Sequence, residues 1–142
     1  MKKTIILSGL AACICFAANA QKLDAAKVPA AAKAAFAKTY PGAVAKWEKE
    51  NGKYEVNFIQ GGKTMSVLMD DKGTISETET DIKVSELPAA VVSYVKQHYK
   101  GQVIKEGAKI TKADGTVNYE AEVGGKDVIF DAAGKFLKET KD

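Results

Sequence analysis

Two stretches of the chain place apolar residues at every fourth position, the spacing that lays a stripe along one face of an α-helix. The first series is Val28, Ala32, Phe36 and Tyr40, and the second is Leu87, Val91, Val95 and Tyr99. A proline follows the first member of each series, and a glycine lies two residues after the last, as at helix starts and ends. The pattern predicts helices at about residues 29–40 and 87–99.

Downstream of each predicted helix the apolar period falls to two, which is typical of a strand with one buried and one wet face. Tyr54, Val56 and Phe58 alternate with polar residues, and so do Val117, Tyr119, Ala121 and Val123. Gly61-Gly62 and Gly124-Gly125 then predict hairpin turns, and the next turns fall at residues 70–73 and 131–134. We expect four antiparallel strands over about residues 43–80 and four more over about 102–139. The first of these begins near Val44, and the last strand of each half is short, around Ile75 and around Phe136.

The two halves therefore have the same order of elements. This predicts an α+β fold, a tandem repeat of one helix plus a four-stranded antiparallel sheet, forming an open sheet with both helices on one face. The two helices could cover one continuous sheet or two abutting sheets, and in either case the reverse face would be bare. The expected organisation is a signal peptide at residues 1–20, a first repeat at 21–84 and a second repeat at 85–142.

The N-terminus has the pattern of a secretory signal peptide. Lys2 and Lys3 precede an uncharged, mostly apolar run, and Ala18-Asn19-Ala20 offers small residues for cleavage after Ala20. We expect a periplasmic or secreted protein with no membrane span in the mature chain. A second possibility is a lipoprotein anchored at Cys13, because Leu10-Ala11-Ala12-Cys13 has the form of a lipidation site.

Composition narrows the classes of partner. The only cysteines lie before Ala20, so the mature chain has none from which to form a disulfide. The basic residues are all lysine, and losing Lys2 and Lys3 leaves 21 − 2 = 19 of them against 18 acids. This near-balance of charge gives no argument for a nucleic acid or an anionic membrane as partner.

The repeated residues resemble a known family. Leu or Val before Pro, Tyr before a nearby Gly, Tyr54-Glu55 and Tyr119-Glu120, a Gly-Gly turn and an Asp-x-x-Gly turn occur in both halves. Over about residues 27–140 the chain resembles the PepSY-like family of small exported bacterial proteins, also described as having the fold of the β-lactamase inhibitor protein. The resemblance implies a helix on a four-stranded sheet, repeated into an open, curved surface, and a role in inhibition or chaperoning.

One departure affects the symmetry of the repeats. Tyr119 follows Tyr54 by 65 positions, whereas Leu87 follows Val28 by 59, so the second copy is 65 − 59 = 6 residues longer before its second strand. The residues that carry the resemblance are turn and core residues, which identify a fold better than an activity.

The candidate catalytic and metal residues lack partners in the sequence. His98 is the only histidine, and with no cysteine nearby it is expected to be a partly exposed helix residue. Asp70 and Asp71 suggest a calcium loop, but the aligned turn keeps only Asp131, as an aspartate capping its own backbone would. We expect that the protein is not an enzyme and that it binds no cofactor and no metal.

The candidate binding residues are polar and apolar positions of the predicted bare face. Trp47 has two open placements, on this face as a binding anchor or in the core at the helix–sheet edge. The other acids and amides are read as a solvated strand face, and the two apolar residues as a small patch. The candidates are Trp47, Glu55, Asn57, Leu68, Asn118, Glu120, Glu122 and Ile129.

The first functional hypothesis is a periplasmic protein-binding module that docks a protein of the cell envelope through the open sheet face, with inhibition by steric occlusion. The alternative is a carrier of a small apolar ligand between helix and sheet, because the alanines at 30–32, 34 and 35 bring little volume to that layer. A third hypothesis, an unrecognised hydrolase, predicts a deep pocket around carboxylates of perturbed pKa.

Overall fold

A computed structural model of the chain describes residues 21–141. Two helices, α1 (Ala30–Thr39) and α2 (Ala89–His98), each follow a short 3₁₀ turn, at Ala25–Lys27 and Val84–Glu86. The strands are β1 (Gln21–Lys22), β2 (Lys46–Glu50), β3 (Lys53–Gln60), β4 (Lys63–Met69), β5 (Ile75–Ile82), β6 (Ile104–Lys112), β7 (Val117–Val123), β8 (Lys126–Asp131) and β9 (Phe136–Lys141). The predicted signal peptide, its cleavage site and Cys13 lie outside the described residues.

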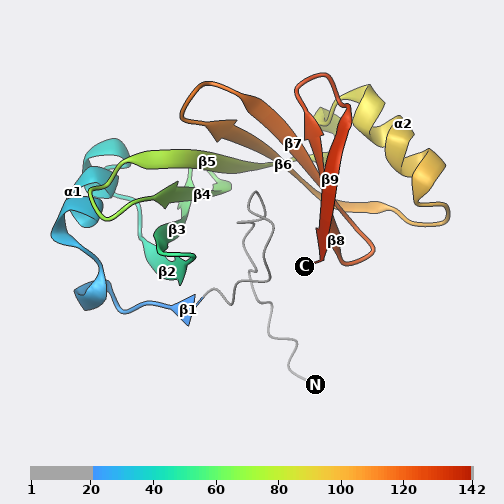
Figure 1. Cartoon of the computed structure of the whole chain (residues 1–142). Coiled ribbons are helices and arrows are strands. Elements are labelled where there is room, and N and C mark those ends of the chain that lie inside the picture. The colour runs from blue at the N-terminus through green and yellow to red at the C-terminus, as the bar shows by residue number, and fades with distance from the viewer. Residues whose placement is uncertain (1–20, 142) are drawn as a thin grey trace.

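All nine strands of the described part form one antiparallel sheet in sequence order, β1 to β9. The sheet continues across the middle of the chain because β5 pairs with β6, with Thr78 opposite Thr111. Figure 1 shows these two long strands crossing the centre, with one helix at each end of the molecule. The sequence predicts only a short strand around Ile75, but β5 has eight residues and joins the two halves.

The predicted helices are confirmed to within about one turn at each end. Each ends at a tyrosine whose N–H donates to the carbonyl four residues earlier, and a glycine of positive φ follows, Gly42 at 81° and Gly101 at 77°. The strand that follows α1, β2, begins at Lys46, whereas the sequence predicts its start near Val44. Val44 is 79% exposed and belongs to the loop that leaves α1.

Two equivalent turns fix the helices against the sheet. Gly73, between β4 and β5, and Gly134, between β8 and β9, both have φ of +83°. A Cβ at Gly73 would lie 2.5 Å from the Cβ of Ala35 on α1, and one at Gly134 would lie 2.7 Å from the Cβ of Ala90 on α2. Ala31 and Ala35 of α1 therefore lie where the turn at Gly73 comes closest to the helix.

Aspartates open the same two turns and bond to their own backbone. Asp70 Oδ1 accepts from the N–H groups of Lys72 and Thr74, at 2.9 and 2.8 Å. Asp131 Oδ1 accepts from the N–H groups of Ala133 and Lys135, both at 2.9 Å. The prediction that these residues are turn-capping aspartates is confirmed.

Each helix covers its own hydrophobic cluster. The first contains Val28, Ala32 and Phe36 with Trp47 and the apolar residues of β3 and β4. The second contains Leu87, Val91 and Val95 with Ala121, Val123, Val128 and Phe130. The stripes with a spacing of four thus mark the buried faces, as predicted.

Strand register places both clusters on the same side of the sheet. Val56 lies opposite Val67, which lies opposite Thr78. Thr78 lies opposite Thr111, which lies opposite Val117 of the second half. Because neighbours across a sheet share a face, this row connects the two helix-covered sides, and both helices lie on one face.

Candidate functional site

The sheet face opposite the helices, which we call the inner face, carries most of the polar residues of the strand centres. Figure 1 shows the sheet bent, with α1 and α2 on its outer side. By strand register, the central residues of the inner face are Glu55, Asn57, Ser66, Leu68, Glu79, Asp81, Ala108, Ile110, Asn118, Glu120, Glu122, Asp127 and Ile129.

Seven of the eight candidate residues lie on this face, and the register brings several together. Glu55 lies opposite Leu68, and Glu120 lies opposite Ile129. Glu122 lies opposite Asp127. Asn57, next to Glu55 on its strand face, and Asn118, next to Glu120, complete the set.

Trp47 does not belong to the inner face. It lies opposite Val56, on the helix side, and its ring meets the ring of Phe36 edge to face at 5.8 Å between centroids. At 7% exposed it is a core tryptophan. Of the two positions that the sequence left possible, Trp47 therefore occupies the core. Because Trp47 pairs with Val56, its neighbours Lys46 and Glu48 lie on the inner face.

The centre of the inner face is buried, where the sequence predicts a solvated face. Glu55 is 1% exposed, and Ile129 is 0% exposed. Neighbouring strands lie only about 4.8 Å apart, and side chains on the inner side of a bent sheet converge further.

Sequence reasoning missed the acids that lie between the predicted ones. Glu79 and Asp81 on β5 and Asp127 on β8 face the same side as Glu55 and Glu120. A signal was present in the alternation of acid and threonine from Glu77 to Asp81. This period of two predicts a full strand with one acidic face.

Burial and mutual repulsion raise the pKa values of the two most enclosed acids. Desolvation, together with the charges of Glu48 and Glu50, raises the pKa of Glu55 to about 8, although Asn57 and Ser66 lower it. Desolvation, followed by the charge of Glu120, raises the pKa of Glu79 well above its ordinary value. In each of these two carboxyl groups, Oε1 is buried and has no hydrogen-bond partner.

Acids towards the rim of the face differ in environment. Glu122 forms an ion pair with Lys105, with 2.8 Å between Oε1 and Nζ. Burial raises the pKa of Asp81, and the charge of Glu106 adds to the shift. The two carboxyl groups described above, of Glu55 and Glu79, lie nearer the centre of the inner face than these acids.

Nothing within residues 21–141 assembles a metal site: no group of three or more His, Cys, Asp or Glu there could hold an ion. His98 is exposed, stacks on Tyr94 with centroids 3.9 Å apart, and places its Nδ1 2.9 Å from the carbonyl oxygen of Tyr94. It lies on the helix side, away from the inner-face carboxyl groups. The carboxylates of perturbed pKa that the hydrolase hypothesis predicts are present, but they have no histidine beside them.

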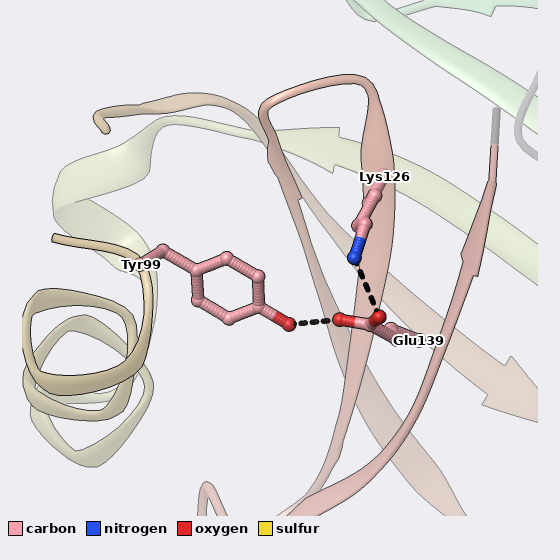
Figure 2. A network of polar contacts seen from close by, with 3 residues as sticks. All are labelled: Tyr99, Lys126 and Glu139. Carbon is pink, nitrogen blue, oxygen red and sulfur yellow. Dashed lines mark hydrogen bonds and ion pairs between the residues drawn. The ribbon is translucent and has the colours of Figure 1, made fainter. Parts of the chain in front are cut away.

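A second polar cluster ties α2 to the last strands (Figure 2). Tyr99, at the end of α2, donates its hydroxyl hydrogen to Glu139 Oε2 on β9. Lys126 Nζ lies 2.6 Å from the other oxygen of the same carboxylate. Desolvation and the bond to Glu139 raise the pKa of Tyr99, while Lys126 and Tyr99 lower the pKa of Glu139. The cluster is a structural link between helix and sheet.

No helix in the described part of the chain is long and apolar enough to cross a membrane. The family described as "Putative beta-lactamase-inhibitor-like, PepSY-like" matches the chain over residues 16–77 and 52–138. Together these stretches cover most of the 142 residues. None of the curated proteins matches the chain.

Solved structures share the fold. A periplasmic protein from Bacteroides eggerthii, described as putative, aligns with a TM-score of 0.72 and 20% identity over 80% of this chain and 88% of its own. A DUF2874 family protein from Bacteroides uniformis gives 0.70 and 22% over the same shares. A BLIP-like protein from Bacteroides fragilis gives 0.60 and 25%, over 80% of this chain and 86% of its own.

Proposed function

Because the chain belongs to the putative β-lactamase-inhibitor-like, PepSY-like family, we propose that it is a periplasmic protein-binding module that docks a protein of the cell envelope on the inner face. The observation that carries this proposal is the inner face itself. Within residues 21–141 both helices pack on the other side of the sheet. A continuous strip of acids, amides and apolar side chains is left without a helix over it.

The composition of the inner face fits docking better than solvation. Leu68 and Ile129 occupy matching positions opposite Glu55 and Glu120, and Ile110 lies opposite Glu79. Side chains of both kinds within one surface allow a partner to bury apolar area and to make charged hydrogen bonds. Inhibition of an enzyme would follow if the docked element belonged to its active-site cleft, by steric occlusion.

The proposal includes the export of the protein to the periplasm and the duplication of one structural unit. The N-terminal pattern of residues 1–20 and the description of the Bacteroides eggerthii protein as periplasmic support export. We infer that residues 21–84 and 85–142 are two copies of one unit. The matched positions of Gly73 with Gly134 and of Asp70 with Asp131 support this duplication.

The test uses the exported protein, purified from the envelope fraction and immobilised. Wild type should retain one reproducible envelope protein, and the double variant Leu68→Ala, Ile129→Ala should lose most of that retention. The matched control truncates two exposed valines, with Val44→Ala and Val103→Ala, which lie outside the inner face. Near-ultraviolet circular dichroism establishes that both variants remain folded.

Equal retention by wild type and by the folded Leu68/Ile129 variant would contradict the proposal. So would loss of retention in the Val44/Val103 control alone, because binding would then lie at the loops that leave the helices. Recovery of the protein from the cytoplasm with residues 1–20 intact would contradict the periplasmic assignment.

A further inference from the structure

We propose that the inner face recognises primary ammonium groups: a lysine-bearing segment of the partner protein seats its side chains at Glu55 and Glu79. This inference rests on the proposed function of the inner face and specifies the chemistry of the partner.

The two acids flank the same strand. Glu55 lies opposite Leu68 on β4, and Glu79 lies opposite Ser66 on the other side of β4. Two strand spacings and two residues along the strand place their Cβ atoms about 12 Å apart in a flat sheet. Glu120 lies one further such step along the same diagonal, so the face presents a line of carboxyl groups.

Both carboxyl groups are held in unfavourable surroundings. Glu55 is 1% and Glu79 6% exposed, and Oε1 of each has no hydrogen-bond partner. An enclosed carboxylate without a partner is costly, and a cation that reaches it removes that cost. The charges that face Glu79 are those of Glu120, Asp81, Glu55 and Asp127, and the charges that face Glu55 are those of Glu48 and Glu50. The charges that raise these two pKa values are acidic, so a cation is the partner that would let the two carboxyl groups lose their protons.

The shape of the missing partner favours an ammonium group. A guanidinium binds best when both oxygens of a carboxylate are free for its planar fork, whereas an ammonium group acts as a point charge. In Glu55, hydrogen bonds with Asn57 and Ser66 already engage the carboxyl group, and Oε1 is left without a partner. Within the described residues, no cluster of acids is close enough to hold a metal ion.

The neighbours of the acids suit the rest of a lysine side chain. Leu68 lies opposite Glu55, and Ile110 lies opposite Glu79, and both are buried. The four-carbon stem of lysine buries along apolar side chains while its head reaches a charged group. At Glu55 and again at Glu79, the inner face thus has an apolar side chain directly beside the carboxyl group.

The probe is the peptide acetyl-Lys-Ala-Ala-Ala-Lys-amide, whose lysines in an extended chain stand about 13 Å apart, close to the separation of the two acids. Carbon-detected NMR of the exported protein follows the side-chain carboxyl carbons of Glu55 and Glu79. We expect both signals to shift with the probe. A probe with both lysines acetylated should bind about tenfold more weakly, and an arginine probe more weakly than the lysine probe.

Glu79→Gln keeps the shape of the side chain and should weaken the lysine probe about tenfold. Asp71→Asn, in an exposed turn, makes the same change in net charge and should have no effect. Equal binding of the acetylated or arginine probe, or equal weakening by Asp71→Asn, would overturn the inference. Thermal unfolding of each variant establishes that it is folded.

The envelope capture separates the two proposals. Retention that survives Glu55→Gln, Glu79→Gln but is lost in the Leu68/Ile129 variant leaves docking intact and overturns the lysine inference. Retention unaffected by either variant overturns both. Loss in both variants, with the partner's lysines protected from acetylation in the complex, supports both.

Discussion

The raised pKa of Glu55 predicts that the free energy of unfolding depends on pH. Its pKa in the folded chain is raised to about 8, whereas the ordinary value is 4.5. Between these values the unfolded chain loses the proton and the folded chain keeps it, so the free energy of unfolding falls as pH rises through this window. Glu79 shifts in the same direction and adds to the effect.

We therefore expect Glu55→Gln to stabilise the protein by roughly 2 kcal/mol at pH 8 and by much less at pH 5. Urea unfolding at both pH values measures the difference. Asp71→Asn, in an exposed turn, is the control and should change neither value. A gain for Glu55→Gln that is larger at pH 5 than at pH 8 would contradict the burial of this carboxyl group.

Tyr99 gives a second residue-scale prediction. Its pKa is raised by desolvation and by the bond to Glu139, so Glu139→Gln should lower it. NMR titration of the Tyr99 ring at alkaline pH measures the shift, with Glu86→Gln as a control distant in sequence. An unchanged Tyr99 titration in Glu139→Gln would show that the contact in Figure 2 is not maintained in solution.

At the residue scale, the sequence predicted which side chains of one strand share a face, but not which face each strand turns to the helices. Alternation in β3 and β7 indicated that Glu55, Asn57, Glu120 and Glu122 share a face, and register confirms it. Alternation cannot give the absolute face of a short strand with one aromatic residue, because a slip by one residue reverses every side chain. For this reason Trp47 had two open placements until its register with Val56 was known.

Among the elements, the turn at Gly73 explains how a short alanine-rich helix is held. Gly73 has a positive φ, and a Cβ there would meet Ala35 at 2.5 Å and the backbone oxygen of Ala31 at 2.9 Å. Gly115 has almost the same φ, +85°, but nothing lies within 4 Å of its added Cβ. A substitution at Gly115 therefore introduces only backbone strain, whereas one at Gly73 introduces the same strain and a clash with α1.

We expect Gly73→Ala to destabilise the protein by about 3 kcal/mol and Gly115→Ala by about 1 kcal/mol. Urea unfolding at a single pH measures both values. Equal losses would mean that the contact between this turn and α1 does not contribute.

The elements themselves were largely predictable, and the exceptions have physical reasons. Spacings of four and two residues distinguish helix from strand because each leaves a different apolar stripe. β5 was underestimated because its helix-side positions include Thr78 and Thr80 in place of large apolar residues. β1 was not predicted, since two residues carry no periodicity.

For the whole molecule, the pairing of β5 with β6 determines whether two small units behave as one. Each half is only about 60 residues, a size at which an isolated unit is marginal. Because β5 and β6 pair in the shared sheet, each half covers a strand edge that the other half would otherwise expose. Sequence periodicity suggested one sheet or two abutting sheets, because pairing between distant strands leaves no local pattern.

We expect one cooperative unfolding transition for the exported protein, with the paired amides of β5 and β6 among the slowest to exchange. Native-state hydrogen exchange measures this, and amides of the helix-to-strand loops at Val44 and Val103 are the fast-exchanging reference. Early exchange along β5 and β6, before either hydrophobic cluster opens, would contradict a continuous sheet.

The central claim is that the inner face is the docking surface, and photo-cross-linking in living cells tests it most directly. A photoreactive residue replaces Thr64 or Glu122, which are half-buried on the inner face, or Lys38 or Lys96, which are exposed on α1 and α2. The account predicts adducts with one envelope protein from Thr64 and Glu122 and none from Lys38 and Lys96. Adducts from the helix positions alone, with none from the inner face, would contradict it.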